Sequence, residues 1–390
     1  MTVSQEHSRY MRRLLAVAAL GLIVAILLAH PRLSAEAAPR AKHATRLEHG
    51  TSPGEWVDRT PQFSATSPRP PAAEDCTAIV DTVANRVVLY GGKNDDNHDL
   101  AEVWTLDLGR FAWSRPEIRG PAPPESEDHV AILDPIGYRM IIHGGENGLT
   151  SNKLWSLDLK SFRWRDLTDT TSPGREDHTA IYDAHRKRMV IFGGRNNTGT
   201  IDYVNEWRLL AFDLDPGSPT FEKWVELTCG DVHAPGRSDH AAVYDAAKDR
   251  MVIFGGWDKV AHEFLDDTWA YYFASSADSA GRWKRIKAKD SHPPKRRHVT
   301  GVYDAGHNWF EVFGGFGDQG FLNDVWAFDL TSDKWINITP GPQPRLDHLA
   351  VFDPRRHQLL VYGGDAHLVH KFHDIWELDV HPDVSADSLR

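Results

Sequence analysis

Short apolar runs that end in a pair of glycines recur along the chain. The runs read VVLYGG, MIIHGG, MVIFGG (twice), FEVFGG and LLVYGG, and their glycine pairs end at Gly92, Gly145, Gly194, Gly256, Gly315 and Gly364. Successive pairs are 49 to 62 residues apart, a period typical of proteins built from repeated β units. Glycine at the end of a strand permits a sharp change of direction with φ > 0. The pattern predicts six copies of one unit.

Two tryptophan signatures follow the glycine pairs. The first is V/L/I-W before an apolar stretch, at Trp104, Trp155, Trp326 and Trp376, with a looser copy at Trp269 and with Leu210 in its place in the third unit. The second lies nine or fourteen residues further on, at Trp113, Trp164, Trp224, Trp283 and Trp335. An Asp-His signature, as in GREDHTAIYDAHRKR, precedes the glycine runs. Each unit therefore predicts four strands, and the tryptophans offer large apolar faces between units.

The last unit lacks its second tryptophan. It ends near Val380, whereas the segment before the first unit reads GEWVDRTP, which matches KWINITP at Trp335. We infer that a strand around Trp56 completes the sixth unit and closes a ring, which removes exposed strand edges.

This order of signatures resembles the kelch repeat over roughly residues 55 to 380. The resemblance implies an all-β fold, a six-bladed kelch-type β-propeller. Galactose oxidase and a bacterial sialic-acid mutarotase use similar propellers, but neither carries over residue by residue. The copper site of galactose oxidase needs a Tyr joined to a Cys, and Cys76 has no convincing Tyr partner in this sequence.

The N-terminal stretch reads as an export signal. Three arginines precede an apolar run from Leu14 to Ala29, too short to span a bilayer, and Ala35-Glu36-Ala37 offers a cleavage site. We expect a signal peptide at 1–37, a linker at 38–53, the propeller at 54–382 and a C-terminal tail at 383–390. The predicted location is secreted or periplasmic, with membrane attachment only if the signal stays uncleaved.

Composition narrows the class of partner. The chain has 44 Lys and Arg against 55 Asp and Glu, a net charge of −11, which argues against a nucleic-acid partner bound through a basic surface. Two cysteines, Cys76 and Cys229, do not make a disulfide framework, and we expect two free thiols.

Antiparallel order places the connections between second and third strands on one face, together with those between blades. We call this the loop face, and the opposite side the turn face. Loops on a rigid scaffold often carry binding residues. Trp257 and Phe316 are expected to stack on an apolar or sugar face, and charged neighbours to select polar groups. The alternative for each position is an ordinary solvated loop residue. The candidate binding residues are Lys93, Glu146, Arg195, Trp257, Phe316, Asp318, Asp365 and His367.

A second set of candidates lies where each first strand begins, nearest the axis: Cys76, His129, His178, His240, His298 and His348. They follow Asp75, Asp128, Asp177, Asp239, Arg297 and Asp347. Imidazole, thiolate and carboxylate groups bind transition metals. Because the pattern recurs in every unit, we interpret it as structural and predict no metal and no cofactor.

The sequence favours an exported binding module for a protein or glycan partner. The alternative is a carbohydrate-active or oxidative enzyme on the same scaffold. The chain has no Gly-x-Ser-x-Gly elbow, phosphate-binding glycine loop or Cys-x-x-Cys pair. Acids and histidines converging at the axis would favour the enzyme, and a broad aromatic face would favour binding.

Overall fold

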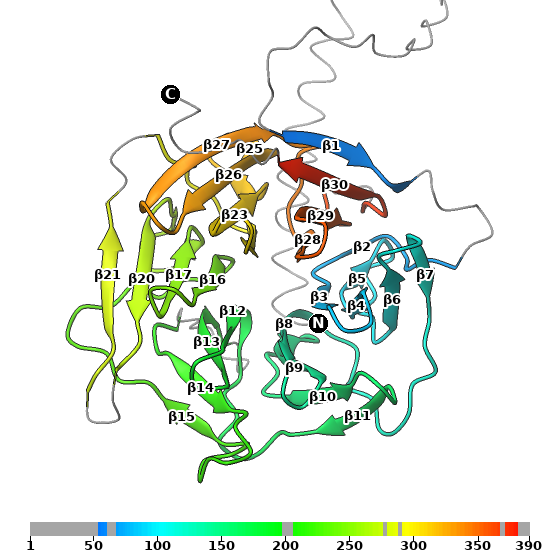
Figure 1. The fold of residues 1–390 in the computed structure, drawn as a ribbon, viewed down its shortest axis with the longest axis horizontal. Helices are drawn as coiled ribbons and strands as arrows, with labels where there is room; N and C mark the ends of the chain where they lie inside the picture. The colour runs from blue at the N-terminus through cyan, green and yellow to red at the C-terminus, as the bar shows by residue number, and fades with distance from the viewer. Residues whose placement is uncertain are drawn as a thin grey trace, which may run out of the picture. The chain divides into compact units, whose positions relative to one another are not determined.

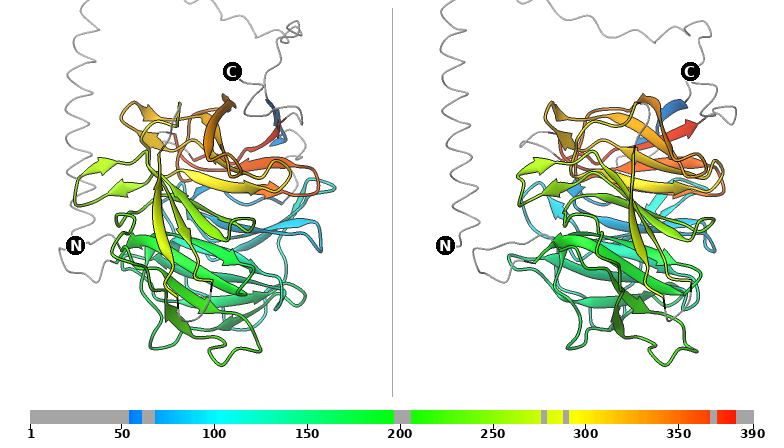
Figure 2. Two further views of the ribbon diagram at one scale, coloured as in Figure 1. Left: turned by 60° about the vertical axis from the view of Figure 1, so that its left-hand side comes forward. Right: turned by 90° about the vertical axis from the view of Figure 1, so that its left-hand side faces the viewer.

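The computed structural model describes residues 54–60, 68–196, 206–275, 279–287, 291–366 and 371–380, all within the unit Ser52–Arg390. In this part of the chain every regular element is a β-strand. Six four-stranded antiparallel sheets surround a central axis, which confirms the predicted six-bladed propeller (Figure 1). The strands run from one face of the ring to the other (Figure 2).

The strands of each blade follow one another from the axis outward. Blade 1 contains β3 (Thr77–Asp81), β4 (Arg86–Tyr90), β6 (Val103–Asp107) and β7 (Ala112–Ser114). Blade 2 contains β8 (Glu127–Asp134), β9 (Arg139–Glu146), β10 (Leu154–Asp158) and β11 (Arg163–Asp166). Blade 3 contains β12 (Glu176–Asp183), β13 (Arg188–Arg195), β14 (Leu210–Asp213) and β15 (Trp224–Glu226).

The second half of the ring repeats this order. Blade 4 contains β16 (Ala241–Asp245), β17 (Arg250–Phe254), β20 (Thr268–Tyr272) and β21 (Arg282–Ile286). Blade 5 contains β22 (Thr300–Asp304), β23 (Trp309–Phe313), β26 (Asp324–Asp329) and β27 (Lys334–Pro340). Blade 6 contains β28 (Leu349–Asp353), β29 (Gln358–Tyr362), β30 (Ile375–Val380) and, outermost, β1 (Gly54–Asp58).

The pairing of β1 with β30 confirms the inferred closure. Trp56 lies opposite Leu378, and Asp58 lies opposite Trp376. Next to the strand, the Arg59 guanidinium pairs with the fully buried carboxylate of Glu377. The two ends of the propeller are therefore joined by both a strand ladder and an ion pair.

The core is divided among the contacts between blades. The described residues form six apolar clusters, one between each pair of neighbouring blades. In blades 1, 2, 4 and 5 both tryptophans pack toward the preceding blade; Trp326 and Trp335 of blade 5, for example, join the cluster with Phe254 of blade 4. The repeated tryptophans thus hold neighbouring blades together, as the sequence predicted.

Three small two-stranded sheets extend the blades on the loop face, and the last two of them are hairpins. They are β2 (Ala73–Glu74) with β5 (Lys93–Asn94), β18 (Trp257–Asp258) with β19 (Glu263–Phe264), and β24 (Phe316–Gly317) with β25 (Gly320–Phe321).

The described part of the chain has no helix long and apolar enough to cross a membrane. The apolar run from Leu14 to Ala29, the predicted linker and the C-terminal tail lie outside the described residues.

Candidate interaction face

The glycine pairs shape the inner edge of the loop face. Gly193 has φ of 72°, and a Cβ there would lie 2.5 Å from Cε1 of His240 in the next blade. The imidazole of His240 therefore packs on bare backbone, while its Nε2 is hydrogen-bonded to Thr179 Oγ1 at 2.8 Å. Burial lowers the pKa of His240 to about 3, so the ring is neutral.

The other histidines of this position follow the same arrangement. The Nε2 atom of His348 is 2.6 Å from Thr300 Oγ1, and that of His178 is 3.0 Å from His143 Nδ1. Burial lowers the pKa of His129 to about 4. These contacts between blades support the structural interpretation of the histidines.

One residue of the predicted ring is placed differently. One residue at the start of the first strand takes a positive φ in each blade, and the six residues are Asp75, Asp128, Asp177, Asp239, His298 and Asp347. In blades 2, 3, 4 and 6 a histidine follows it, and in blade 1 Cys76 does. His298 therefore occupies the aspartate position, and Val299 occupies the histidine position, so the predicted equivalence of His298 with His240 is corrected. We call these six residues with positive φ the axial ring.

The axial ring lines a cavity of about 140 Å³. His298 Nδ1 lies 2.5 Å from Asp347 Oδ1 and 3.4 Å from Asp239 Oδ1, and Arg195 pairs with Asp177. Burial works against protonation of His298, but the two carboxylates outweigh it and raise its pKa to about 9. On the other side of the axis, burial and neighbouring carboxylates raise the pKa of Asp75 and Asp128 well above the usual range.

Glutamates lie beside the axial ring in blades 1 to 3 and are matched by cations of the same chain. Lys371 Nζ is 2.8 Å from Glu74 Oε1, and Lys93 pairs with Glu127. Arg195 Nε lies 3.6 Å from Glu176 Oε1. Two sets of three acids are each compact enough to share a cation, because the carboxylate oxygens within a set lie within 4.8 Å of one another. The sets are Glu74, Asp75 and Asp347, and Glu127, Asp128 and Glu146. Lys93 and Arg195 are predicted from the sequence to select a ligand, but both form ion pairs with acids of the same chain. Glu146, another predicted binding residue, is itself one of the clustered acids.

Trp257 and Phe316, the two predicted aromatic anchors, come together on neighbouring hairpins of blades 4 and 5. Phe264 links them, because its ring centroid is 5.0 Å from that of Trp257 and 5.9 Å from that of Phe316. Phe316 also contacts Phe321 at 5.2 Å. We call these four half-buried side chains the aromatic cluster. The sequence identified two of its members, and aromatic residues on both strands of each hairpin would have revealed the others.

The remaining candidates are dispersed. Asp318 is exposed at the turn of the β24–β25 hairpin. Asp365 forms backbone bridges with Leu346 and Lys371 in blade 6. His367 lies outside the described residues.

Sequence reasoning missed a set of buried arginines below the loop face. Arg175, Arg237, Arg296 and Arg345 each donate from Nη1 to the carbonyl of the first glycine of a pair, 18 residues later. In blades 4 to 6 the arginine also holds an aspartate that accepts the indole N–H of the first tryptophan; Arg296 binds Asp324, which binds Trp326. The signal was Arg two residues before the positive-φ position and Asp two residues before Trp.

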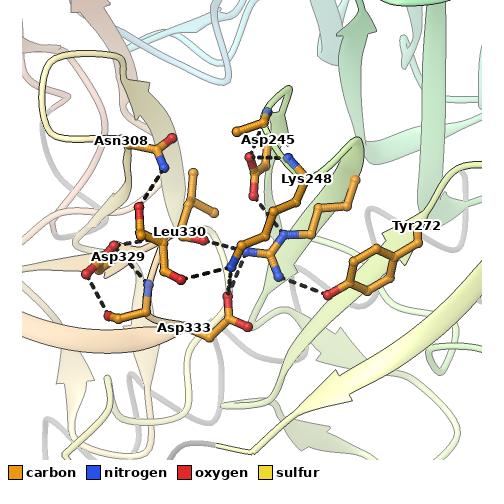
Figure 3. Close-up of polar contacts among 11 residues, drawn as sticks. Asp245, Lys248, Tyr272, Asn308, Asp329, Leu330 and Asp333 are labelled. Atoms are coloured by element: carbon orange, nitrogen blue, oxygen red, sulfur yellow. Dashed lines mark hydrogen bonds and ion pairs between the residues drawn. The ribbon is translucent and has the colours of Figure 1, made fainter.

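The turn face is joined by ion pairs between blades. Arg250 of blade 4 is fully buried, with Nε 2.8 Å from Asp245 and Nη2 2.7 Å from Asp333 of blade 5. Lys248 adds a pair with Asp333 at 3.1 Å (Figure 3). An aspartate at the end of the first strand with arginine five residues later, as in Asp183 and Arg188, marks this network in the sequence. These charged side chains of the turn face therefore stabilise the contacts between blades.

Comparisons with known proteins agree with this architecture. The family model described as KLHDC2/KLHL20/DRC7 Kelch-repeats domain matches residues 55–217, 136–338 and 218–384. Putative adagio-like protein 2 of Oryza sativa subsp. japonica is 29% identical over 328 residues, which cover 78% of this chain and 47% of that protein. Host cell factor 2 of Homo sapiens is 26% identical over 65% of this chain and 32% of its own length. The chain thus matches less than half of the length of these relatives.

A solved structure has the same fold. The protein in "Structure of YjhT" aligns with a TM-score of 0.60 and 16% sequence identity, covering 79% of this chain and 95% of that one. At this identity the likeness concerns the fold alone. With the family model matching almost the whole propeller, the chain belongs to the kelch-repeat family.

Proposed function

We propose that this kelch propeller is an interaction module that binds a protein partner through the aromatic cluster on its loop face. The observation that carries the proposal is the convergence of Trp257, Phe264, Phe316 and Phe321 on two adjacent hairpins. Partly exposed aromatic side chains held rigidly on a scaffold are the groups that most often dominate the binding energy of protein interfaces.

Other exposed apolar side chains in the connections of the loop face support the same assignment. Val260, at the turn of the β18–β19 hairpin, is 79% exposed, and Trp207 before β14 is 43% exposed and stacks on His233. Kelch propellers generally bind protein partners, which agrees with this assignment. The turn face is occupied by the ion pairs between blades and offers less for a partner.

A glycan partner and an enzymatic activity have weaker support. Ligand pockets usually enclose about 300 to 1,000 Å³. The axial cavity, where acids and histidines do converge, has about 140 Å³. Export of the chain to the outside of the cell or to the periplasm remains part of the proposal, and it rests on the N-terminal sequence pattern.

The test is affinity enrichment of partners on the immobilised chain, followed by calorimetry with each purified candidate. We expect the Trp257→Ala and Phe316→Ala variants to bind at least tenfold more weakly. Arg110→Ala is the control, because its side chain is 85% exposed on the turn face and its guanidinium makes only a 3.8 Å contact with Asp107 among the described residues. Equal loss in the control, or no loss in the two cluster variants, would contradict the assignment.

A further inference from the structure

Blade 5 reverses the charge of the repeat beside the axial ring. The residue before the positive-φ position is Glu74, Glu127 and Glu176 in blades 1 to 3, Ser238 in blade 4 and Leu346 in blade 6. In blade 5 it is Arg297. Each of the three glutamates has a cation of the same chain beside it, namely Lys371, Lys93 and Arg195.

No such counter-ion accompanies Arg297. Among the described residues its guanidinium forms no ion pair, and its buried Nε atom has no hydrogen-bond partner. The guanidinium carbon instead lies 5.5 Å from the ring centroid of Trp257 and 5.8 Å from that of Phe264. The guanidinium therefore contacts the aromatic cluster; the buried Asp239 carboxylate, whose pKa it helps to lower, forms no ion pair with it among the described residues.

The backbone holds Arg297 firmly in this place. Its N–H donates to the Phe316 carbonyl at 2.9 Å, and its carbonyl accepts from the Phe316 N–H at 2.8 Å. An arginine that is oriented in advance and flanked by aromatic rings is well suited to bidentate binding of a carboxylate, because less side-chain entropy is lost.

The neighbouring charges favour a singly charged ligand. Lys295, two residues earlier, is already paired with Glu263 at 3.3 Å. Asp258 in the first hairpin and Asp318 in the second add negative charge. A dianionic phosphate would be repelled by these acids, whereas one carboxylate matches one free guanidinium.

We propose that Arg297 receives the side-chain carboxylate of an Asp or Glu in the protein partner, while an apolar residue beside that acid packs on Trp257 and Phe316. This inference rests on the proposed function of the aromatic cluster. It makes the recognised segment an internal acidic and apolar peptide.

The test is selection of peptides from two random display libraries against the full chain, one with peptides fused at both ends and one with free C-termini. We expect enrichment of Asp or Glu next to an apolar residue in the first library. The Arg297→Gln variant should bind the selected peptides at least tenfold more weakly. Lys295→Gln is the matched control and should change affinity less than twofold, and thermal unfolding checks that all variants fold.

A double-mutant cycle sharpens the assignment. Replacing the Asp or Glu of a selected peptide by Asn or Gln should weaken its binding to the parent chain as much as Arg297→Gln does. The same replacement should not weaken binding to the Arg297→Gln variant any further. The Arg297→Glu variant, which restores the charge of blades 1 to 3, should select basic peptides instead.

The outcomes separate the two proposals. Peptides that lose binding with Trp257→Ala but not with Arg297→Gln overturn the inference and leave the proposed function standing. Dependence on Arg297 only in the library with free C-termini overturns the side-chain source of the carboxylate. Peptides insensitive to both Trp257→Ala and Phe316→Ala, or no enrichment in either library, contradict both proposals.

Discussion

His298 and Asp347 join blades 5 and 6 at the axis of the propeller, with 2.5 Å between Nδ1 and Oδ1. In the other five blades the position of His298 is an aspartate. A sixth aspartate would leave the axial ring without its protonated imidazole. The one departure from the repeat therefore places a cation among five acids.

Replacing His298 by Asn should destabilise the fold in a pH-dependent way. The pKa of His298 is raised to about 9, above its ordinary value of 6.5, so its stabilisation is fully present below pH 6.5 and is lost as pH rises through 9. At about 1.4 kcal/mol per pKa unit, we expect a loss of about 3 kcal/mol at pH 6 and little difference at pH 10. Urea unfolding at pH 6, 8 and 10 measures this. A pH-independent difference would show that the ion pairs are not responsible.

Glu311 should also lower the stability of the fold as pH rises, but over a lower pH range. It lies in β23, where the other blades carry Val, Ile or Leu, and its carboxylate oxygens have no hydrogen-bond partner among the described residues. Burial raises its pKa to about 8, so stability falls as pH rises from 4.5 to 8, because only the unfolded chain ionises readily.

The Glu311→Val variant should therefore be more stable than the parent by about 1 to 3 kcal/mol at pH 8. The gain should shrink toward pH 5. Parallel unfolding curves at the two pH values provide the measurement, and an equally large gain at both would point to packing rather than ionisation.

The ring architecture could be predicted because each blade repeats the same signals. The glycine pairs and tryptophans each have one local role, which the six copies made visible. The shift at His298 was detectable by counting: the residue 15 positions before the first glycine is His240 in blade 4, but Val299 in blade 5. Because RRHVT also contains a histidine near this point, the sequence pattern aligns His298 with the histidines of the other blades although it lies one position earlier.

Charge pairing was much harder to anticipate. Lys93 and Arg195 are charged residues in loops, as ligand-binding residues often are, yet both form ion pairs with acids of the same chain. Conversely, the sequence pattern groups Arg297 with the repeat, and only the arrangement in space shows that no carboxylate of the described residues forms an ion pair with it. Which cations are used internally depends on contacts between blades, and these are not encoded by the spacing within one unit.

Removing one partner of a buried ion pair below the loop face should strongly destabilise the fold. Arg296 is fully buried and binds Asp324 with both Nη atoms at 2.7 Å. Asp324→Ala leaves this charge unpaired, and we expect a loss of about 3 to 5 kcal/mol. Asp266→Ala, a half-buried residue that makes a 3.5 Å contact with His292, serves as control and should cost less than about 1 kcal/mol. Similar losses in both variants, measured by chemical unfolding, would refute the role of the pair.

The N-terminal pattern predicts processing at a defined bond. If the chain is exported, cleavage after Ala37 removes the arginine-flanked apolar run, and the mature protein begins at Ala38. N-terminal sequencing of the protein produced by its own host measures this directly. A mature chain that retains Leu14 to Ala29 would rule out cleavage and leave the segment as an anchor.

Closure of the ring by β1 should control its stability. Deleting residues 54–60 removes the ladder to β30 and leaves the Glu377 carboxylate without Arg59, although Arg356 still lies 2.7 Å from it. It also removes the contact of Trp56 with Phe313 of blade 5, whose ring centroids are 5.4 Å apart. Blade 1 loses the contact of Arg59 with the Phe111 ring, 5.2 Å from guanidinium carbon to ring centroid. Because blades 5, 6 and 1 all lose contacts, we expect a lower melting temperature and a broader transition.

Two single substitutions, compared with the deletion, separate the contribution of the β1–β30 strand pairing from those of the side chains. Trp56→Ala keeps the strand and should cost about 2 to 3 kcal/mol, less than truncation of a fully buried tryptophan, because Trp56 is half-buried. Arg59→Gln keeps both the strand and the indole and tests the ion pair alone. The deletion should exceed either substitution, since it also exposes the edge of β30. If the deletion melts at the same temperature as Trp56→Ala, β1 contributes only its tryptophan, and closure of the sheet is not what holds the ring together.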